Sequence, residues 1–165
     1  MKTVLAGWQT NGIFVAQTGM PFNVTTSNDY TNTGRSNQRP NLVGVPSANC
    51  DSGHLTNCID MTAFALPSNY AWGNFGRNVL RGPGFWNLDF SLFKDFAVSE
   101  RFKVQFRSEF FNFTNTPQFA NPSVALPGLS SGNLSYASVN PGSFGSITST
   151  IHDNREIQMA LKVIF

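Results

Sequence analysis

The feature that most constrains this chain is an alternation of apolar and polar side chains that recurs in four segments. Successive side chains of a β-strand point to opposite faces, so a period of two predicts a strand that meets two different environments. The last segment shows this most plainly, because every second residue from Ile157 to Phe165 is apolar. The segments are GWQTNGIFVAQT (7–18), FWNLDFSLFKDF (85–96), RFKVQFRSEFFNF (101–113) and REIQMALKVIF (155–165).

A helix is the alternative for the last two segments. Phenylalanines between 102 and 113 fit a helical stripe, and the tail contains the good helix formers Met159, Ala160 and Leu161. Val104 and Phe111 would fall off that stripe, however, and the tail alternates without a break. The pattern therefore favours strands in all four segments.

The composition is that of a folded chain with few charges. Charged residues make up 12% of the sequence, about half the usual share, and phenylalanine alone supplies 16 residues. Such a chain is too aromatic for a disordered segment, and a net charge of +2 gives no reason to expect a nucleic-acid partner. No apolar run approaches the roughly 20 residues of a membrane-spanning helix.

The links between the segments are unequal. Only AVSER (97–101) joins the second segment to the third, whereas long stretches rich in Asn, Gly, Pro and Ser follow the first and third segments. In an antiparallel sheet both long links lie at one end, and outer-membrane barrels have this asymmetry of short periplasmic turns and long outside loops. The pattern thus predicts an all-β, antiparallel transmembrane β-barrel fragment with two long extracellular loops. A soluble antiparallel sheet with one wet face is the alternative.

Charged side chains occupy the polar positions of the predicted strands. We expect them to face the water-filled lumen of the barrel and to form charge pairs across neighbouring strands. Nothing in the sequence offers a catalytic set, since His54 and His152 have no adjacent nucleophile, so neither an enzyme nor a cofactor is expected. The expected lumen-facing charges are Asp89, Asp95, Lys103, Arg107 and Glu109.

Several blocks resemble the carboxy-terminal end of TonB-dependent receptors, and of their Oar-like group in particular. The most specific blocks are RGPGFWNLDFSLFKDF and REIQMALKVIF, and the resemblance covers nearly the whole chain. It implies that residues 1–165 are the last part, about four strands, of a plugged barrel of about 22 strands in the bacterial outer membrane. About eight strands are the smallest single-chain barrel, so we expect a fragment. We also expect the plug domain of such receptors to be absent from residues 1–165.

The resemblance also implies a function and partners. Such receptors import scarce nutrients, namely metal chelates, cobalamin or glycans, with energy passed from the TonB complex through the plug. The expected partners are outer-membrane lipid, the remainder of the barrel and plug, and an unknown small-molecule ligand. The alternative function is that of a surface-exposed β-domain that binds carbohydrate or protein.

The end of the last strand also takes its meaning from this resemblance. The last strand of such receptors commonly ends in an aromatic residue that the barrel-assembly machinery recognises, so Phe165 is a candidate assembly signal; an interfacial aromatic girdle is the simpler explanation. The residues expected on the same lipid-facing row are Val163, Leu161, Met159 and Ile157.

Cys50 and Cys58 lie in the first long link. On the outer surface they would meet an oxidising environment, which favours a disulfide between them. A metal site that includes His54 is the alternative, but the Cys-x3-His-x3-Cys spacing matches no common zinc pattern.

Overall fold

The computed structural model describes residues 6–128, 140 and 142–165. The chain divides into two compact units. The first, here called the sheet unit, comprises Met1–Gln17, Phe85–Gln118 and His152–Phe165. The second, called the loop unit, comprises Thr18–Gly84 and Phe119–Ile151, and so contains most of the two long links.

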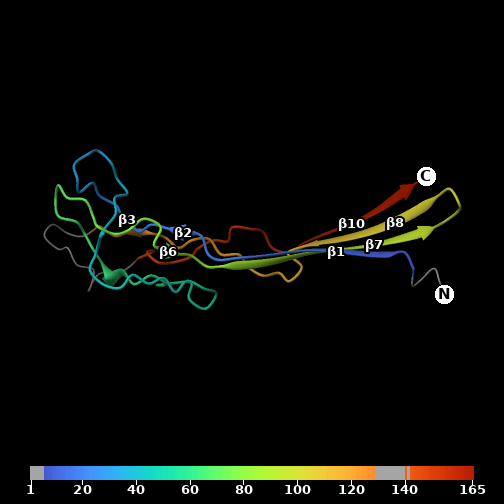
Figure 1. Ribbon diagram of the computed structural model, residues 1–165, viewed down its shortest axis with the longest axis horizontal. Helices are drawn as coiled ribbons and strands as arrows, with labels where there is room; N and C mark the ends of the chain where they lie inside the picture. The colour runs from blue at the N-terminus through green and yellow to red at the C-terminus, as the bar shows by residue number, and fades with distance from the viewer. Residues whose placement is uncertain (1–5, 129–139, 141) are drawn as a thin grey trace. The chain divides into compact units, whose positions relative to one another are not determined.

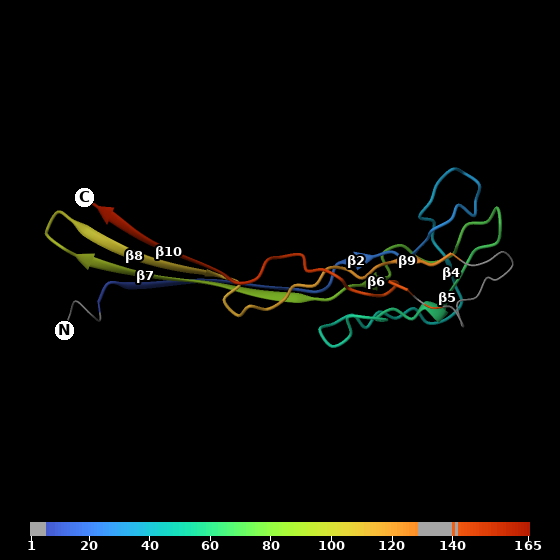
Figure 2. The same ribbon diagram turned by 180° about the vertical axis from the view of Figure 1, so that it is seen from behind.

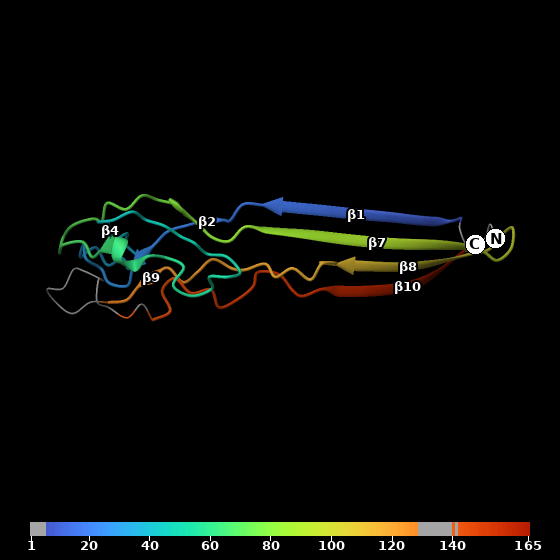
Figure 3. The ribbon, with the colours of Figure 1, turned by 90° about the horizontal axis from the view of Figure 1, so that it is seen from below.

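The sheet unit is a four-stranded antiparallel sheet in the order β1-β7-β8-β10 (Figures 1 and 3). Each strand falls on one of the four alternating segments, which confirms the prediction of strands rather than helices. The sheet is open, with β1 and β10 at its edges, and does not close into a barrel. The strands are β1 (Trp8–Gln17), β7 (Phe85–Ala97), β8 (Lys103–Phe111) and β10 (Glu156–Ile164).

The register brings the apolar rows of all four strands onto one face. Phe14 lies opposite Leu88, Phe90 opposite Phe110, and Leu161 opposite Phe106. Since directly opposed residues of an antiparallel pair point the same way, these rows form one continuous surface, here called the apolar face. Its other members include Trp8, Trp86, Leu92, Phe96, Val104, Ile157, Met159 and Val163. The intervening residues form the opposite, polar face.

The apolar face of the edge strands is not covered. Every residue of β1 and of β10 is exposed, and the side chain of Leu161 is 74% accessible. Soluble proteins rarely expose a contiguous apolar surface of this kind. The surface therefore requires a partner or a non-aqueous solvent.

Lys94 is the one cation in the apolar row of β7. Its side chain is only 2% accessible, and its ammonium lies 5.1 Å from the ring centre of Trp8 and 5.5 Å from that of Phe96. The ammonium also donates to the carbonyl of Ala6. Aromatic faces attract a cation electrostatically, so these contacts account for a lysine on an otherwise apolar surface.

The predicted short link is a tight turn between β7 and β8, at the end of the sheet where β10 stops (Figure 2). The amides of Val98 and Ser99 both donate to the carbonyl of Phe102, at 3.0 and 3.1 Å. The hydroxyl of Ser99 accepts from the amides of Arg101 and Phe102. The side chain of Ser99 thus fixes the turn locally.

The loop unit has short strands and a core of its own. We expected two loops dominated by turn residues, and the structure instead packs both links around buried apolar side chains. Phe64 is central, with its ring edge-on to Phe75 at 5.1 Å and to Phe144 at 6.4 Å. The buried residues are Phe22, Val24, Cys50, Cys58, Ile59, Met61, Ala63, Phe64, Leu66, Phe75, Leu80, Leu126, Phe144 and Ile147.

Three strand pairs join the segments of the loop unit. Two are antiparallel, β2 with β6 and β4 with β5, whereas β3 and β9 pair in parallel. The strands are β2 (Pro21–Phe22), β3 (Thr25–Thr26), β4 (Asn41–Leu42), β5 (Phe64–Ala65), β6 (Leu80–Arg81) and β9 (Ala125–Leu126), and a 3-10 helix, η1, spans Met61–Ala63. Among the described residues, no helix has the length and apolar character needed to span a membrane.

Candidate functional site

A pocket of about 490 Å³ opens on the polar face, at the end of the sheet where β1 ends and β7 begins. Its volume falls within the range of about 300–1,000 Å³ that is typical of small-molecule sites. Val15 of β1, Asn87 of β7, Phe111 of β8 and Glu156 of β10 contribute side chains. The pocket is thus built across the whole width of the sheet.

The strand period and register explain why these residues meet. Residues 85, 87 and 89 of β7 point to the same face because side chains alternate along a strand. Val15 lies directly opposite Asn87, and Glu156 lies directly opposite Phe111. The remaining polar lining comes from segments that flank the strands, namely Asn112 and Gln118 after β8 and His152, Asp153 and Asn154 before β10.

Asp89 organises the floor of the pocket. Its Oδ1 accepts a hydrogen bond of 2.9 Å from Nδ2 of Asn87 and another of 2.9 Å from the backbone amide of Asn112. The first bond links two positions of β7, and the second ties β7 to the chain beyond the end of β8. Asp89 was one of the predicted lumen-facing charges, and it is the one that lines the pocket.

Asn112 fixes the turn that leads from β8 to Gln118. Its backbone adopts φ 50°, a left-handed conformation that asparagine tolerates better than most residues. Its side-chain amide donates to the carbonyl of Thr116 at 3.1 Å and accepts from the amide of Thr116 at 3.0 Å. This closed pair of bonds holds the short segment that delivers Gln118 to the pocket.

Two acceptor oxygens of the pocket accept no hydrogen bond from the described residues: Oδ1 of Asn87 and Oε1 of Gln118. The oxygens are buried, and the whole residue Gln118 is only 5% accessible. More than nine in ten buried polar groups in native proteins are partnered. Both residues line the pocket, so a donor from another molecule that reaches these oxygens would be favourable.

The pocket combines negative charge with aromatic surface. Asp89, Asp153 and Glu156 are its carboxylates, and none of its described lining residues is a lysine or arginine. Phe85 and Phe111 supply apolar rings, and the ring of His152 lies 6.1 Å from that of Phe85. The site can thus offer hydrogen-bond acceptors together with flat apolar surface.

The other predicted charges lie on the same polar face, but the predicted pairing across strands is wrong. Arg107 pairs with Glu109 of its own strand at 3.0 Å and lies 4.7 Å from the ring centre of Phe93. The register puts Phe93, not an acid, opposite Arg107, and it puts Gln105 opposite Asp95. Asp95 accordingly accepts from Gln105 at 2.8 Å.

Lys103, the fifth predicted charge, is exposed at the start of β8 and lies opposite Ala97. Among the described residues, Arg107–Glu109 is the only ion pair that involves any of these five side chains. Side-chain pairing on this face therefore follows the register, which the alternation alone does not specify.

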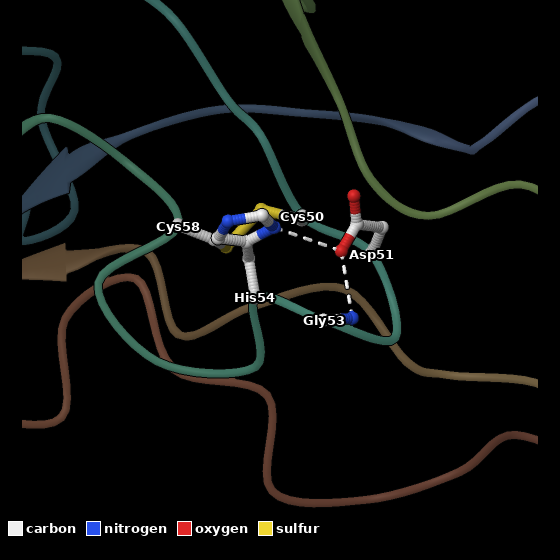
Figure 4. Close-up of polar contacts among 5 residues, drawn as sticks. All are labelled: Cys50, Asp51, Gly53, His54 and Cys58. Atoms are coloured by element: carbon white, nitrogen blue, oxygen red, sulfur yellow. Dashed lines mark hydrogen bonds and ion pairs between the residues drawn. A yellow bond between two sulfur atoms is a disulfide. The ribbon is translucent and has the colours of Figure 1, made fainter.

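Cys50 and Cys58 form a disulfide in the loop unit (Figure 4). Inside the ring, Oδ1 of Asp51 lies 3.0 Å from Nδ1 of His54 and accepts from the amide of Gly53 at 2.8 Å. The bond with His54, aided by that amide, lowers the pKa of Asp51 below its ordinary value. No group of three or more potential metal ligands exists among the described residues, and both sulfurs are used by the disulfide.

The apolar row of β10 is exposed along its length, and the side chain of Phe165 is 85% accessible. Ile157, Met159, Leu161 and Val163 lie on the apolar face, as their alternation predicted. Their part in assembly, together with that of Phe165, stays a prediction.

A family model described as an outer membrane beta barrel domain matches residues 1–158. The chain belongs to this family. Its location is therefore the bacterial outer membrane, and the four long strands are wall strands of an outer-membrane barrel domain. No curated protein and no solved structure matches the chain.

Membership in an outer-membrane barrel family explains the exposed apolar face. The walls of such barrels carry an outward apolar band, which meets lipid rather than water. Strands of about 9–11 residues are long enough to cross the hydrocarbon region when tilted, and the four strands have 10, 13, 9 and 9 residues.

The sequence did not reveal most of the pocket. Gln118, Asn112 and Phe85 carry no functional signal in the sequence, and His152 has no adjacent nucleophile. They come from separate segments that meet only when β7, β8 and β10 pair. The available signal was the concentration of amide and histidine residues directly beside strand ends that share one end of the sheet.

Proposed function

We propose that this chain is the carboxy-terminal barrel segment of a TonB-dependent transporter that takes up a scarce nutrient. The observation that carries the proposal is the division of one sheet into an apolar face and a polar face with a pocket at the end that leads into the long links. In such a transporter the apolar face meets lipid and the polar face meets the lumen.

The orientation follows from the lengths of the links. Both links of the loop unit leave and re-enter the sheet at the end that carries the pocket, whereas the tight turn lies at the other end. Outer-membrane barrels have their long loops outside and their short turns in the periplasm. The pocket would then lie toward the outer mouth of the lumen, where an arriving nutrient is first met.

The sequence resemblance supports the finer assignment. The blocks around RGPGFWNLDFSLFKDF and the tail resemble those of TonB-dependent receptors. The proposal requires the remainder of the barrel, a plug and the TonB complex as partners. The predicted nutrients remain metal chelates, cobalamin and glycans.

Uptake measurements test the proposal. Cells that lack the gene and cells that lack TonB are compared with the wild type for uptake of labelled ferric chelates, cobalamin and oligosaccharides. We expect at least one compound to be lost to the same extent in both strains. If deletion of the gene leaves every uptake rate unchanged, or if its effect persists without TonB, the transporter proposal is wrong.

The alternative of a surface module that binds carbohydrate or protein is favoured by one observation, the independent core of the loop unit. This unit also has a polar pocket of about 330 Å³ between Arg39 and Arg77. A surface module would bind its ligand without any dependence on TonB and would transport nothing, so the same measurements separate the two functions.

A further inference from the structure

We infer that the pocket on the polar face binds an uncharged sugar. The inference rests on the proposed function for its transport meaning, because it names the class of solute that this face of the barrel would receive. Binding itself depends only on the pocket. The pocket's orphaned acceptors, its charge and its aromatic surface each favour such a ligand.

The orphaned acceptors call for a ligand rich in donors. Oε1 of Gln118 and Oδ1 of Asn87 accept no hydrogen bond from the described residues, although both are buried. A buried acceptor left without a partner is destabilising, and a ligand that donates to it restores the lost interaction. Sugar hydroxyls can donate to both oxygens and accept from other amide groups of the lining at the same time.

The charge of the pocket disfavours an anionic ligand. Its lining has the carboxylates of Asp89, Asp153 and Glu156 and, among the described residues, no lysine or arginine. An acidic sugar, a phosphate or a negatively charged chelate would meet like charges and no counter-charge. Of the three nutrient classes that the resemblance implies, an uncharged glycan is the one that suits this lining best.

A cationic ligand is less suitable than a neutral one. The Oδ1 atom of Asp89, the least exposed of the three carboxylates, already accepts from Asn87 and from the amide of Asn112. Asp153 and Glu156 are exposed, so solvent and salt weaken both their attraction for a cation and their repulsion of an anion. An anion additionally finds no lysine or arginine among the described lining residues. The unmet hydrogen-bonding capacity belongs to amide oxygens, which are neutral.

The aromatic part of the lining fits the apolar C–H faces of a sugar ring. Phe85 is half-buried and Phe111 is 45% exposed, so both residues can offer ring surface to the pocket. A pyranose ring presents C–H groups on its faces and hydroxyls around its edge. Aromatic surface beside a few well-placed polar groups is the usual composition of a small-molecule pocket.

The test is a binding measurement on protein extracted from the outer membrane in a detergent without a sugar head group. The neutral probes are maltotriose, cellotriose and mannotriose. The matched charged probes are trigalacturonate, which is anionic, and the trimer of glucosamine, which is cationic. We expect at least one neutral trimer to bind about tenfold or more tightly than either charged trimer, which is the scale of one well-made hydrogen bond.

Variants assign the binding to this pocket. Gln118→Leu removes the orphaned acceptor and is expected to weaken binding of the neutral trimer about tenfold. Gln158→Leu is the matched control, because Gln158 lies on the same polar face but does not line the pocket; its binding should equal that of the wild type. If Gln118→Leu fails to assemble, Phe111→Ala gives the test, since it removes exposed ring surface from the pocket lining.

The outcomes of these measurements separate this inference from the transporter proposal. Failure of all three neutral trimers to bind, tighter binding of either charged trimer, or undiminished binding by Gln118→Leu and Phe111→Ala would overturn the inference. TonB-dependent uptake without sugar binding would leave the transporter proposal standing and remove only this inference. Sugar binding at the pocket without any effect of TonB on uptake would leave this inference standing and overturn the transporter proposal.

Discussion

The two units of this chain use the same residue type in opposite ways. In the loop unit Phe64, Phe75 and Phe144 are almost wholly buried against one another. In the sheet unit Phe14 is 64% exposed on the apolar face, beside Trp86, which is 42% exposed. The loop unit therefore supplies its own apolar interior, whereas the sheet unit obtains one only from what surrounds it.

This difference shows which solvent each unit has evolved to meet. Apolar burial from water stabilises a fold by about 25 cal/mol per Å², and the loop unit has gathered its apolar side chains accordingly. The sheet has placed its apolar rows on the outside, which is favourable only in hydrocarbon. Substitutions should therefore have effects that depend on the unit and, within the sheet, on the face.

The largest effect is expected from Phe75→Ala in the core of the loop unit. Truncation of a buried phenylalanine removes its burial and leaves a cavity, at a cost of about 3–5 kcal/mol. Proteolysis of the protein in intact outer membranes would measure the free energy of unfolding of the loop unit, while the amount of protein in the membrane reports on the sheet. Trp72→Ala is the control, because Trp72 lies in the same unit at 65% exposure and should change stability by no more than about 0.5 kcal/mol. Equal losses in the two variants would contradict the assigned core.

The next largest effect should come from a charge on the apolar face. Met159 and Gln158 are neighbours on β10 that point to opposite faces. Met159→Arg is expected to destabilise the assembled protein by about 2–4 kcal/mol, the cost of arginine near the bilayer midplane. Gln158→Arg should have little effect, because its new charge lies opposite Glu109 on the polar face. Urea unfolding in lipid vesicles measures both, and similar losses would mean that the two faces do not meet different solvents.

The sheet was predictable from the sequence to a degree that the loop unit was not. The segment expected over 85–96 became β7 at Phe85–Ala97, and the tail became β10 at Glu156–Ile164. A period of two is a local signal, so it can be recognised in one segment without knowledge of the partner strand. What it leaves open is register, which is why the expected charge pairs across strands were wrong.

The core of the loop unit gives no such local signal. Its strands β2, β3, β4, β5, β6 and β9 are two residues long, too short for any period to appear. Val24 and Leu126 are both fully buried although about a hundred positions separate them. The contacts that define the unit join segments far apart in sequence, so turn-rich composition suggested loops and concealed a core. The same reason hid the pocket, whose lining comes from separate strand ends.

Loss of the disulfide should weaken the loop unit alone. The bond joins cysteines eight residues apart, and loop-closure entropy assigns about 2–3 kcal/mol to a ring of that size. The paired substitution of Cys50→Ala and Cys58→Ala should therefore increase proteolysis of the loop unit and leave the level of membrane-inserted protein unchanged. Reductant should reproduce this effect on the wild type and add nothing to the double variant. An additional loss with reductant would point to a target other than this bond.

The smallest effect concerns the carboxylate inside the disulfide ring. Its hydrogen bonds with His54 and Gly53 lower the pKa of Asp51 below the ordinary 3.8. A lowered pKa in the folded state means that the stabilisation is present above the ordinary value and disappears as the pH falls through the lowered one. The difference in melting temperature of the loop unit between wild type and Asp51→Asn should thus be constant near neutral pH and vanish as the pH falls below 3.8 and through the lowered pKa. Because Asp51 is exposed, this difference should be smaller than the effect of losing the disulfide, and a difference that persists at the acid end would show that the side chain acts by some means other than its charge.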